Sequence, residues 1–282
     1  MKQIIYLLTI LNFNWAIGLQ GLIIPSNSKI LATAGAGIAS NLYPELNPGI
    51  KPTNNSFLQY SINQWLGEIK GNNILYRWGE KYNKQLSIQT WNVDKLELRG
   101  DSPSETPIET FGAHFVSASY SMSCNLNNKS YLGFLVKTNY SHLFTESLYG
   151  ITFDFGLGLS LKDYLNLGIV IRNIGYENTN TLQANLPTEF GIGTETKFAF
   201  IKTSILTDLL YTNMQSELRL GLITDWKWLN INLGSSFSKN RNANSLGFSF
   251  DYRKWKINSG IYFHENSSIL GVPIFIDICH YL

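Results

Sequence analysis

The sequence predicts an all-β protein: a transmembrane antiparallel up-and-down β-barrel of about 14 strands, with about 12 as the alternative count. Three observations predict this class, namely regular apolar–polar alternation, a low charge content and an export signal. The alternation is clearest over residues 217–264, where four consecutive segments each alternate apolar with polar side chains. Since successive side chains on a strand point to opposite faces, each segment has one apolar and one polar face.

The composition is low in charge and rich in aromatic residues and glycine. Charged residues make up 15% of the chain, against roughly 25% in typical soluble proteins. Aromatics reach 13%, and there are 23 glycines. The formal net charge is only +2, with no Lys/Arg cluster, so the sequence predicts no nucleic-acid partner.

Residues 1–18 have the features of a signal peptide. Lys2 precedes the apolar run 4–17, and the small residues Ala16 and Gly18 suit a cleavage site. A short membrane anchor is the alternative, but the run is too short to cross a bilayer comfortably. No later segment reaches about 18 consecutive apolar residues, so no transmembrane helix is predicted.

Residues 19–56 form a second predicted unit, rich in small side chains. Ala and Gly dominate residues 32–39, and Asn47-Pro48-Gly49 follows. Small side chains allow a backbone to pack closely against another surface. We therefore expect this segment to fold into the lumen as a plug, with a solvated periplasmic lead-in as the alternative.

Residues 57–282 form the predicted barrel. The expected strands are 57–64, 71–79, 84–98, 111–124, 130–143, 148–161, 164–174, 188–198, 200–211, 217–227, 229–238, 245–253, 255–264 and 273–281. In the second half of the chain, very short links alternate with longer polar ones. Outer-membrane barrels have short periplasmic turns and longer outside loops. We therefore expect an outer-membrane protein of a Gram-negative bacterium, with both termini in the periplasm.

A soluble β-sandwich or lipocalin would also alternate, but with its apolar face inward. The export signal, the low charge and a nearly uncharged apolar face favour the membrane barrel. Aromatic side chains also gather at the strand ends, as in the interfacial girdles of such barrels. Examples are Trp226, Trp228, Tyr252 and Trp255.

Few residues indicate chemistry. The histidines, His114, His142, His264 and His280, fall on different predicted strands without metal-ligand spacing. We expect no metal, no cofactor and no enzymatic activity; a Ser–His pair across strands is the enzymatic alternative, because only geometry reveals such a pair. Cys124 and Cys279 fall on non-adjacent predicted strands, which disfavours a disulfide between them while leaving it open.

Charged residues of both signs fall on the predicted inner face. We expect them to pair across strands and to brace a narrow, plugged lumen, because a wide selective pore more often shows one dominant sign. The main members of this predicted ladder are Asp154, Arg172, Glu217, Arg219, Asp251 and Arg253.

Three stretches, in order along the chain, resemble the PorV/PorQ family, relatives of the FadL-type fatty-acid channels. They are residues 29–39 with Asn47-Pro48-Gly49, residues 59–69, and residues 152–158 with Arg172-Asn173-Ile174-Gly175 and Leu186-Pro187.

This resemblance implies a FadL-like 14-stranded barrel that acts in type IX protein secretion. The implied partners are outer-membrane lipid and either secretion-system subunits or the C-terminal domains of secreted cargo. On resemblance, the candidate functional residues are Gly35, Gly37, Asn47, Pro48 and Gly49. The alternative function is a FadL-like channel for the uptake of hydrophobic small molecules.

Overall fold

The computed structural model describes residues 20–52, 55–79, 82–98, 106–178, 186–212, 215–239, 242–265 and 267–282. The predicted signal peptide, residues 1–18, lies outside these described ranges. No helix within them is long and apolar enough to cross a membrane.

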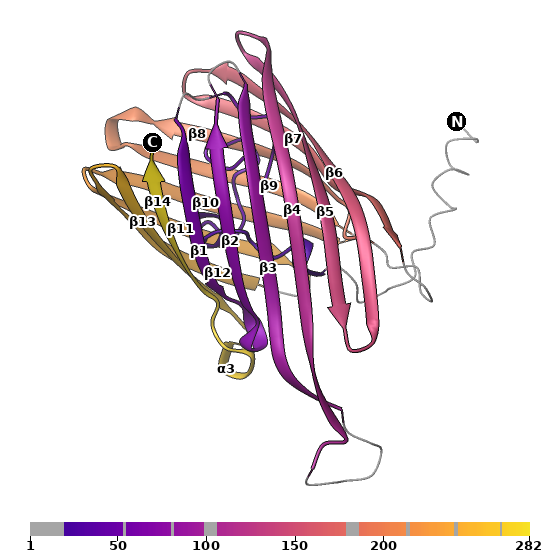
Figure 1. The fold of residues 1–282 in the computed structure, drawn as a ribbon. Coiled ribbons are helices and arrows are strands. Elements are labelled where there is room, and N and C mark those ends of the chain that lie inside the picture. Colours follow the sequence, from indigo (N-terminus) through magenta and orange to yellow (C-terminus); the bar gives the residue numbers. More distant parts are fainter. Residues whose placement is uncertain are drawn as a thin grey trace.

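Antiparallel strands close into a single barrel (Figure 1). Each strand pairs with its neighbours in sequence, and β1 pairs with β14 to close the ring. This confirms the predicted all-β barrel and its count of 14 rather than 12. The strands are β1 Phe57–Gln64, β2 Lys70–Trp78, β3 Asn83–Leu98, β4 Glu109–Asn127, β5 Ser130–Leu143, β6 Glu146–Lys162, β7 Leu165–Asn178, β8 Glu189–Phe198, β9 Thr203–Thr212, β10 Gln215–Trp226, β11 Leu229–Ser238, β12 Asn242–Tyr252, β13 Trp255–His264 and β14 Ile274–Tyr281.

The two ends of the barrel differ. At the terminus end, where Phe57 of β1 lies opposite Tyr281 of β14, the strand connections are short. The connection between β8 and β9 carries the 3-10 helix η3 (Ala199–Ile201). The opposite, loop end carries η2 (Leu66–Glu68), α3 (Ser267–Leu270) and the projecting β3–β4 hairpin (Figure 1). Two loop-end connections are also only two residues long, the one between β5 and β6 and the one between β9 and β10, so the difference in loop length is a tendency.

The apolar face of the strands points outward. On β1, Leu58 and Ile62 are 47% and 56% exposed, whereas Ser61 between them is fully buried. A soluble barrel would show the reverse. Tryptophan and tyrosine side chains at the terminus end are also exposed, led by Tyr252 at 68% and Trp226 at 66%. An apolar outer surface edged by aromatics suits lipid, so the chain is an outer-membrane β-barrel.

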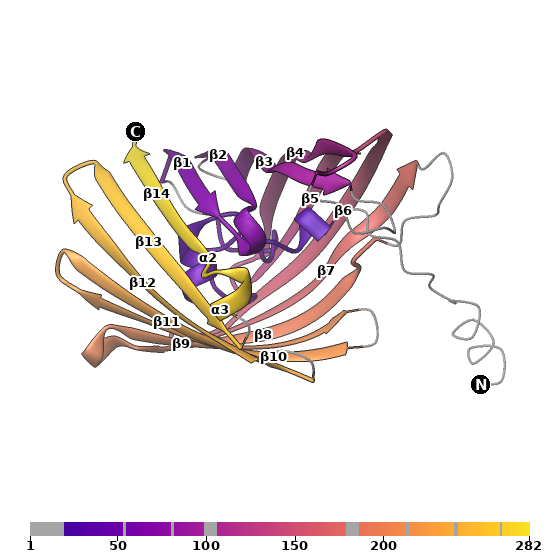
Figure 2. The same ribbon diagram turned by 90° about the horizontal axis from the view of Figure 1, so that it is seen from below.

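Residues 21–50, here called the inner segment, lie within the ring of strands (Figure 2). The segment begins within η1 (Gln20–Leu22) and contains the short helix α2 (Ser28–Ala32). Asn27 caps α2 by accepting a hydrogen bond from the amide of Ile30 at 3.1 Å. Most of the segment is buried, and Leu31 and Ala36 have no exposed surface. The core of the protein is therefore the contact between this segment and the inner wall.

Candidate functional site: a cavity beside the inner segment

Glycines on the inner wall determine how closely the inner segment approaches the strands. A Cβ atom at Gly158 would lie 2.1 Å from the carbonyl oxygen of Gly49, and one at Gly168 would lie 2.3 Å from that of Ile38. Several of these glycines are direct cross-strand partners. We call them the glycine belt: Gly133, Gly156, Gly158, Gly168, Gly193, Gly221, Gly234, Gly247 and Gly260. The belt lets backbone pack directly on backbone, which accounts for part of the high glycine content.

Buried carboxylates on the wall hold the segment in position. Asp277 of β14 accepts hydrogen bonds from the amide of Ser28 at 3.1 Å and from its hydroxyl at 2.6 Å. Asp208 of β9 accepts from the amides of Gly37 and Ile38. Buried charges require such partners, so these carboxylates specify the path of the segment through the lumen.

The predicted Asn-Pro-Gly motif forms part of this contact. The Asn47 amide donates to the carbonyl of Ile38 at 2.8 Å and to that of Leu157 on β6 at 3.2 Å. Its oxygen accepts from the amide of Gly49 at 2.8 Å. The carbonyl of Pro48 reaches the space where Gly133 would carry a Cβ. The geometry thus gives these residues a role in seating the inner segment.

The two predicted glycines adopt backbone conformations that favour glycine. Gly35 has φ 76° and Gly37 has φ 144°. A Cβ at Gly37 would lie 2.3 Å from the Tyr43 ring. Of the five residues selected on resemblance, Gly35 alone lines the cavity described below.

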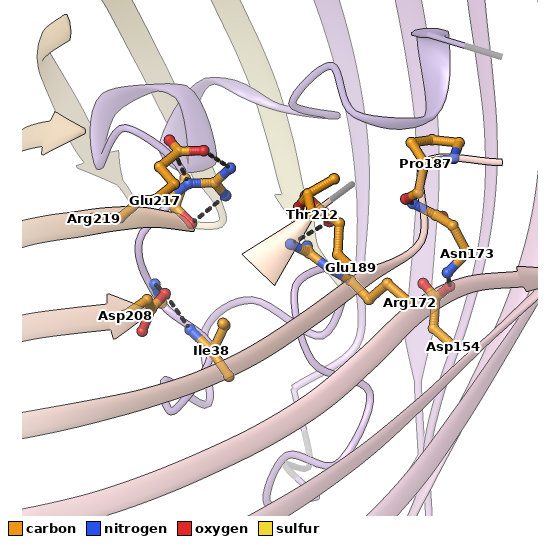
Figure 3. A network of polar contacts seen from close by, with 12 residues as sticks. Ile38, Asp154, Arg172, Asn173, Pro187, Glu189, Asp208, Thr212, Glu217 and Arg219 are labelled. Atoms are coloured by element: carbon orange, nitrogen blue, oxygen red, sulfur yellow. Dashed lines mark hydrogen bonds and ion pairs between the residues drawn. The ribbon is translucent and has the colours of Figure 1, made fainter. Parts of the chain in front are cut away.

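The structure divides the predicted charge ladder between two places. Asp251 pairs with Lys256 at 2.9 Å near the terminus end, and Arg253 lies in the adjacent turn over the Tyr252 ring. The other four lie deeper in the lumen (Figure 3).

These four charged residues are closely paired. Arg172 forms an ion pair with Glu189 at 2.7 Å, and Arg219 donates two hydrogen bonds of 2.9 and 3.0 Å to the carboxylate of Glu217. Asp154 pairs with Lys137 at 2.7 Å. Asp154 also accepts from the amide of Asn173, where the β6–β7 register shifts.

A cavity of about 650 Å³ lies between the inner segment and the loop end of the barrel. One side of it is apolar: Trp65 and Ile69 come from the β1–β2 connection, Tyr262 comes from β13, and Leu22 and Ile24 come from the inner segment. The rings of Trp65 and Tyr262 lie 5.9 Å apart. Such a surface can hold an apolar molecule.

The opposite side of the cavity is charged but balanced. The acidic lining residues are Glu45, Glu189 and Glu217, and the basic ones are Lys137, Arg172 and Arg219. Three negative charges therefore face three positive charges, so the lining has no dominant sign. This balance does not fit an ion-selective pore.

Sequence reasoning missed several of these residues. Asp208 and Asp277 fall on the polar positions of the alternation in their strands. That alternation alone could have predicted that both side chains point into the lumen. The sequence carries no signal for their partners on the inner segment. Trp65, Ile69 and Tyr262 belong to separate elements, and only the closed barrel brings them together.

The remaining reactive side chains do not form a site in the described ranges. Cys124 on β4 and Cys279 on β14 are both free. His114 and His142, predicted on different strands, are cross-strand partners with rings 6.4 Å apart. No cluster of three or more metal-ligating side chains occurs among the described residues.

A closed 14-stranded barrel with a lipid-facing apolar surface and an N-terminal segment in its lumen defines a FadL-like outer-membrane barrel. The fold is similar to the CymD monoaromatic hydrocarbon channel, with TM-score 0.65, 12% identity, and 92% of this chain and 97% of that chain covered. It is also similar to the Pseudomonas putida toluene transporter TodX, with TM-score 0.63, 11% identity and coverage of 91% and 98%. A Pseudomonas aeruginosa FadL homologue gives TM-score 0.64, 10% identity and coverage of 92% and 98%.

Comparison by sequence, in contrast, finds no match: no protein-family model and no curated protein matches the chain. The implied FadL-like barrel is confirmed. The PorV/PorQ assignment and the type IX secretion role receive no support from the comparisons. Two of the three similar structures are named as a channel and a transporter.

Proposed function

We propose that the protein is a channel that admits hydrophobic small molecules through the outer membrane. The observation that carries this proposal is the cavity of about 650 Å³, with its apolar side formed by Trp65, Ile69 and Tyr262. Its volume lies within the roughly 300–1,000 Å³ of small-molecule sites. The names of the similar structures, a monoaromatic hydrocarbon channel and a toluene transporter, support the same class of ligand.

The inner segment acts in this proposal as a movable closure. It contacts the wall along the glycine belt and through Asp208 and Asp277, so passage along the lumen requires part of it to shift. Type IX secretion is the leading function implied by the sequence resemblance, and no structural observation favours it over the channel.

Uptake by whole cells tests the proposal. A Gram-negative host expressing the protein should accumulate a labelled hydrocarbon, toluene or octane, faster than the same host without it. Trp65→Glu should slow this uptake at least about tenfold, because a charge in the apolar side of the cavity is unpaired and costly to bury. Trp228→Glu, at the exposed rim, is the matched control and should not slow it.

Two results would overturn the proposal. One is hydrocarbon uptake that does not depend on expression. The other is co-purification of secretion-system subunits from crosslinked outer membranes together with unchanged uptake in Trp65→Glu, which would favour the secretion role.

A further inference from the structure

Polarity changes steadily around the cavity. Its apolar side belongs to β13 and the β1–β2 connection, through Tyr262, Trp65 and Ile69. Hydroxyl side chains follow on both flanks, Ser117 on β4 and Ser236 on β11. The far side, from β5 to β10, carries the ion pairs. A molecule lying across the lumen therefore meets apolar rings at one end and polar groups at the other.

The apolar side is continuous with an aromatic cluster. The Trp65 ring lies 5.9 Å from Tyr262 and 6.0 Å from Phe275, and Trp91 lies 5.8 Å from Phe275. Phe275 is fully buried. Aromatic rings packed in this way form a rigid apolar surface, which suits a hydrocarbon chain or ring.

The charged side offers hydrogen-bond donors without a net positive charge. Arg172 and Arg219 are already paired, with Glu189 and Glu217. An incoming carboxylate would have to compete with these acidic groups, and a displaced buried carboxylate would be left unpaired at a high energetic cost. An uncharged oxygen needs only a donor.

The two arginines differ in how many donors they have left. Arg219 bonds both Glu217 oxygens and also donates to the carbonyl of Gly35 at 3.3 Å, so three of its five N–H donors are in use. Arg172 lines the cavity and pairs with Glu189 through Nη2. Its Nε has neither a hydrogen-bond partner nor exposed surface, so the Nη groups are the ones that can meet a ligand. Of the two arginines, Arg172 therefore has more N–H donors left for a ligand oxygen.

We infer that the ligand of this cavity is a neutral amphiphile, an apolar chain or ring that ends in an uncharged oxygen such as a hydroxyl or carbonyl. Its apolar part lies against Trp65 and Tyr262, and its oxygen accepts a hydrogen bond from Arg172. This inference rests on the proposed channel function and makes Arg172 the residue that selects the head group.

Three ligands of equal chain length separate the possibilities: 1-octanol, octane and octanoate. Their binding is measured by calorimetry on the full chain in lipid nanodiscs, with empty nanodiscs as the blank. We expect 1-octanol to bind at least about tenfold more tightly than octane, which has no acceptor for Arg172, and than octanoate, which must compete with Glu189.

Arg172→Met should remove this preference and bring 1-octanol to within about twofold of octane. Because the substitution leaves the buried Glu189 carboxylate without its ion-pair partner, the double variant Arg172→Met with Glu189→Gln is measured beside it. Arg253→Met makes the same change at an arginine outside the cavity and should keep the tenfold preference. A general loss of structure would weaken the binding of octane as much as the binding of 1-octanol. Loss of head-group selection would change only the ratio of the two affinities.

The outcomes separate the two proposals. Equal binding of octane and 1-octanol to the unaltered protein, or tightest binding of octanoate, would overturn the head-group inference and leave the channel intact. The head-group inference also fails if the double variant folds and keeps the preference. If none of the three ligands binds, both the channel proposal and this inference are wrong.

Discussion

The carboxylate of Asp208, on β9, accepts hydrogen bonds from the backbone amides of Gly37 and Ile38 at 2.6 and 3.0 Å. Asp208 has no exposed surface, and its other oxygen has no hydrogen-bond partner. One wall residue thus fixes two consecutive amides of the inner segment, at the point where Gly37 adopts a positive φ. The segment is held by specific contacts as well as by shape.

Removing this contact should loosen the segment. Asp208→Ala leaves two buried amides without an acceptor, which costs roughly 1–3 kcal/mol for each group. We expect the amides of Gly37 and Ile38 to exchange hydrogen at least about tenfold faster, measured by mass spectrometry on the folded barrel. Asp251→Ala, at the terminus-end rim, should leave their exchange unchanged. Unchanged protection in Asp208→Ala would show that the glycine belt alone holds the segment.

A single methyl group on the glycine belt should destabilise the protein. The Cβ of Gly158→Ala would lie 2.1 Å from the carbonyl oxygen of Gly49, so the segment or β6 must move. Overpacking of this kind typically costs about 1–3 kcal/mol. We expect a lower midpoint of urea unfolding, measured by tryptophan fluorescence.

The control for the belt is Gly150→Ala on the same strand. Its Cβ would lie no closer than 3.2 Å to another residue, at the carbonyl of Tyr176. The expected loss is clearly smaller than for Gly158→Ala. Equal losses for the two variants would mean that β6 resists any added side chain, and the belt would have no special role.

A covalent link between the segment and the wall should close the channel. The Cβ of Ala36 lies 3.2 Å from the position that a Cβ at Gly221 would take, close to the roughly 3.5–4.5 Å found in disulfides. In a background with Cys124→Ser and Cys279→Ser, the pair Ala36→Cys and Gly221→Cys should stop hydrocarbon uptake when oxidised and restore it when reduced. Each single cysteine variant should be insensitive to oxidant. Full uptake through the oxidised pair would place the moving part elsewhere.

Lys29 on the inner segment should make stability depend on pH. Burial lowers its pKa to about 8, with the positive charge of Lys256 acting in the same direction. Because the folded-state pKa lies below the unfolded value of 10.5, the charged form is penalised in the fold. The penalty is complete below pH 8 and fades as the pH rises toward 10.5.

Lys29→Met should therefore stabilise the barrel at pH 7 by about 1–2 kcal/mol, after allowance for solvent screening. The gain should shrink toward zero near pH 10.5. Urea midpoints of both proteins, compared at each pH, measure the difference. A gain that stays constant across this range would show that packing, rather than charge, separates the two side chains.

The barrel itself could be predicted from the sequence because its signal is local. Alternation such as Tyr60 outside and Ser61 inside repeats on every strand, and it depends only on the two-residue period of a strand. Even the strand bounds are close: the alternation predicts a strand over 148–161 where β6 runs from Glu146 to Lys162. The low charge content and the export signal predicted that the apolar face points outward. In an outer membrane that face contacts lipid, which is the one solvent that favours its exposure.

The tertiary structure decided everything that depends on the inner segment. Asp208 and Gly37 are 171 residues apart, and no period in the sequence links them. The same holds for the cavity, where Trp65 and Tyr262 meet because β1 closes on β14. Local alternation determines which way each side chain points, but closure of the ring and the path of the segment determine what it meets. The sequence by itself determined the membrane barrel, and only the tertiary structure decided its candidate ligand site.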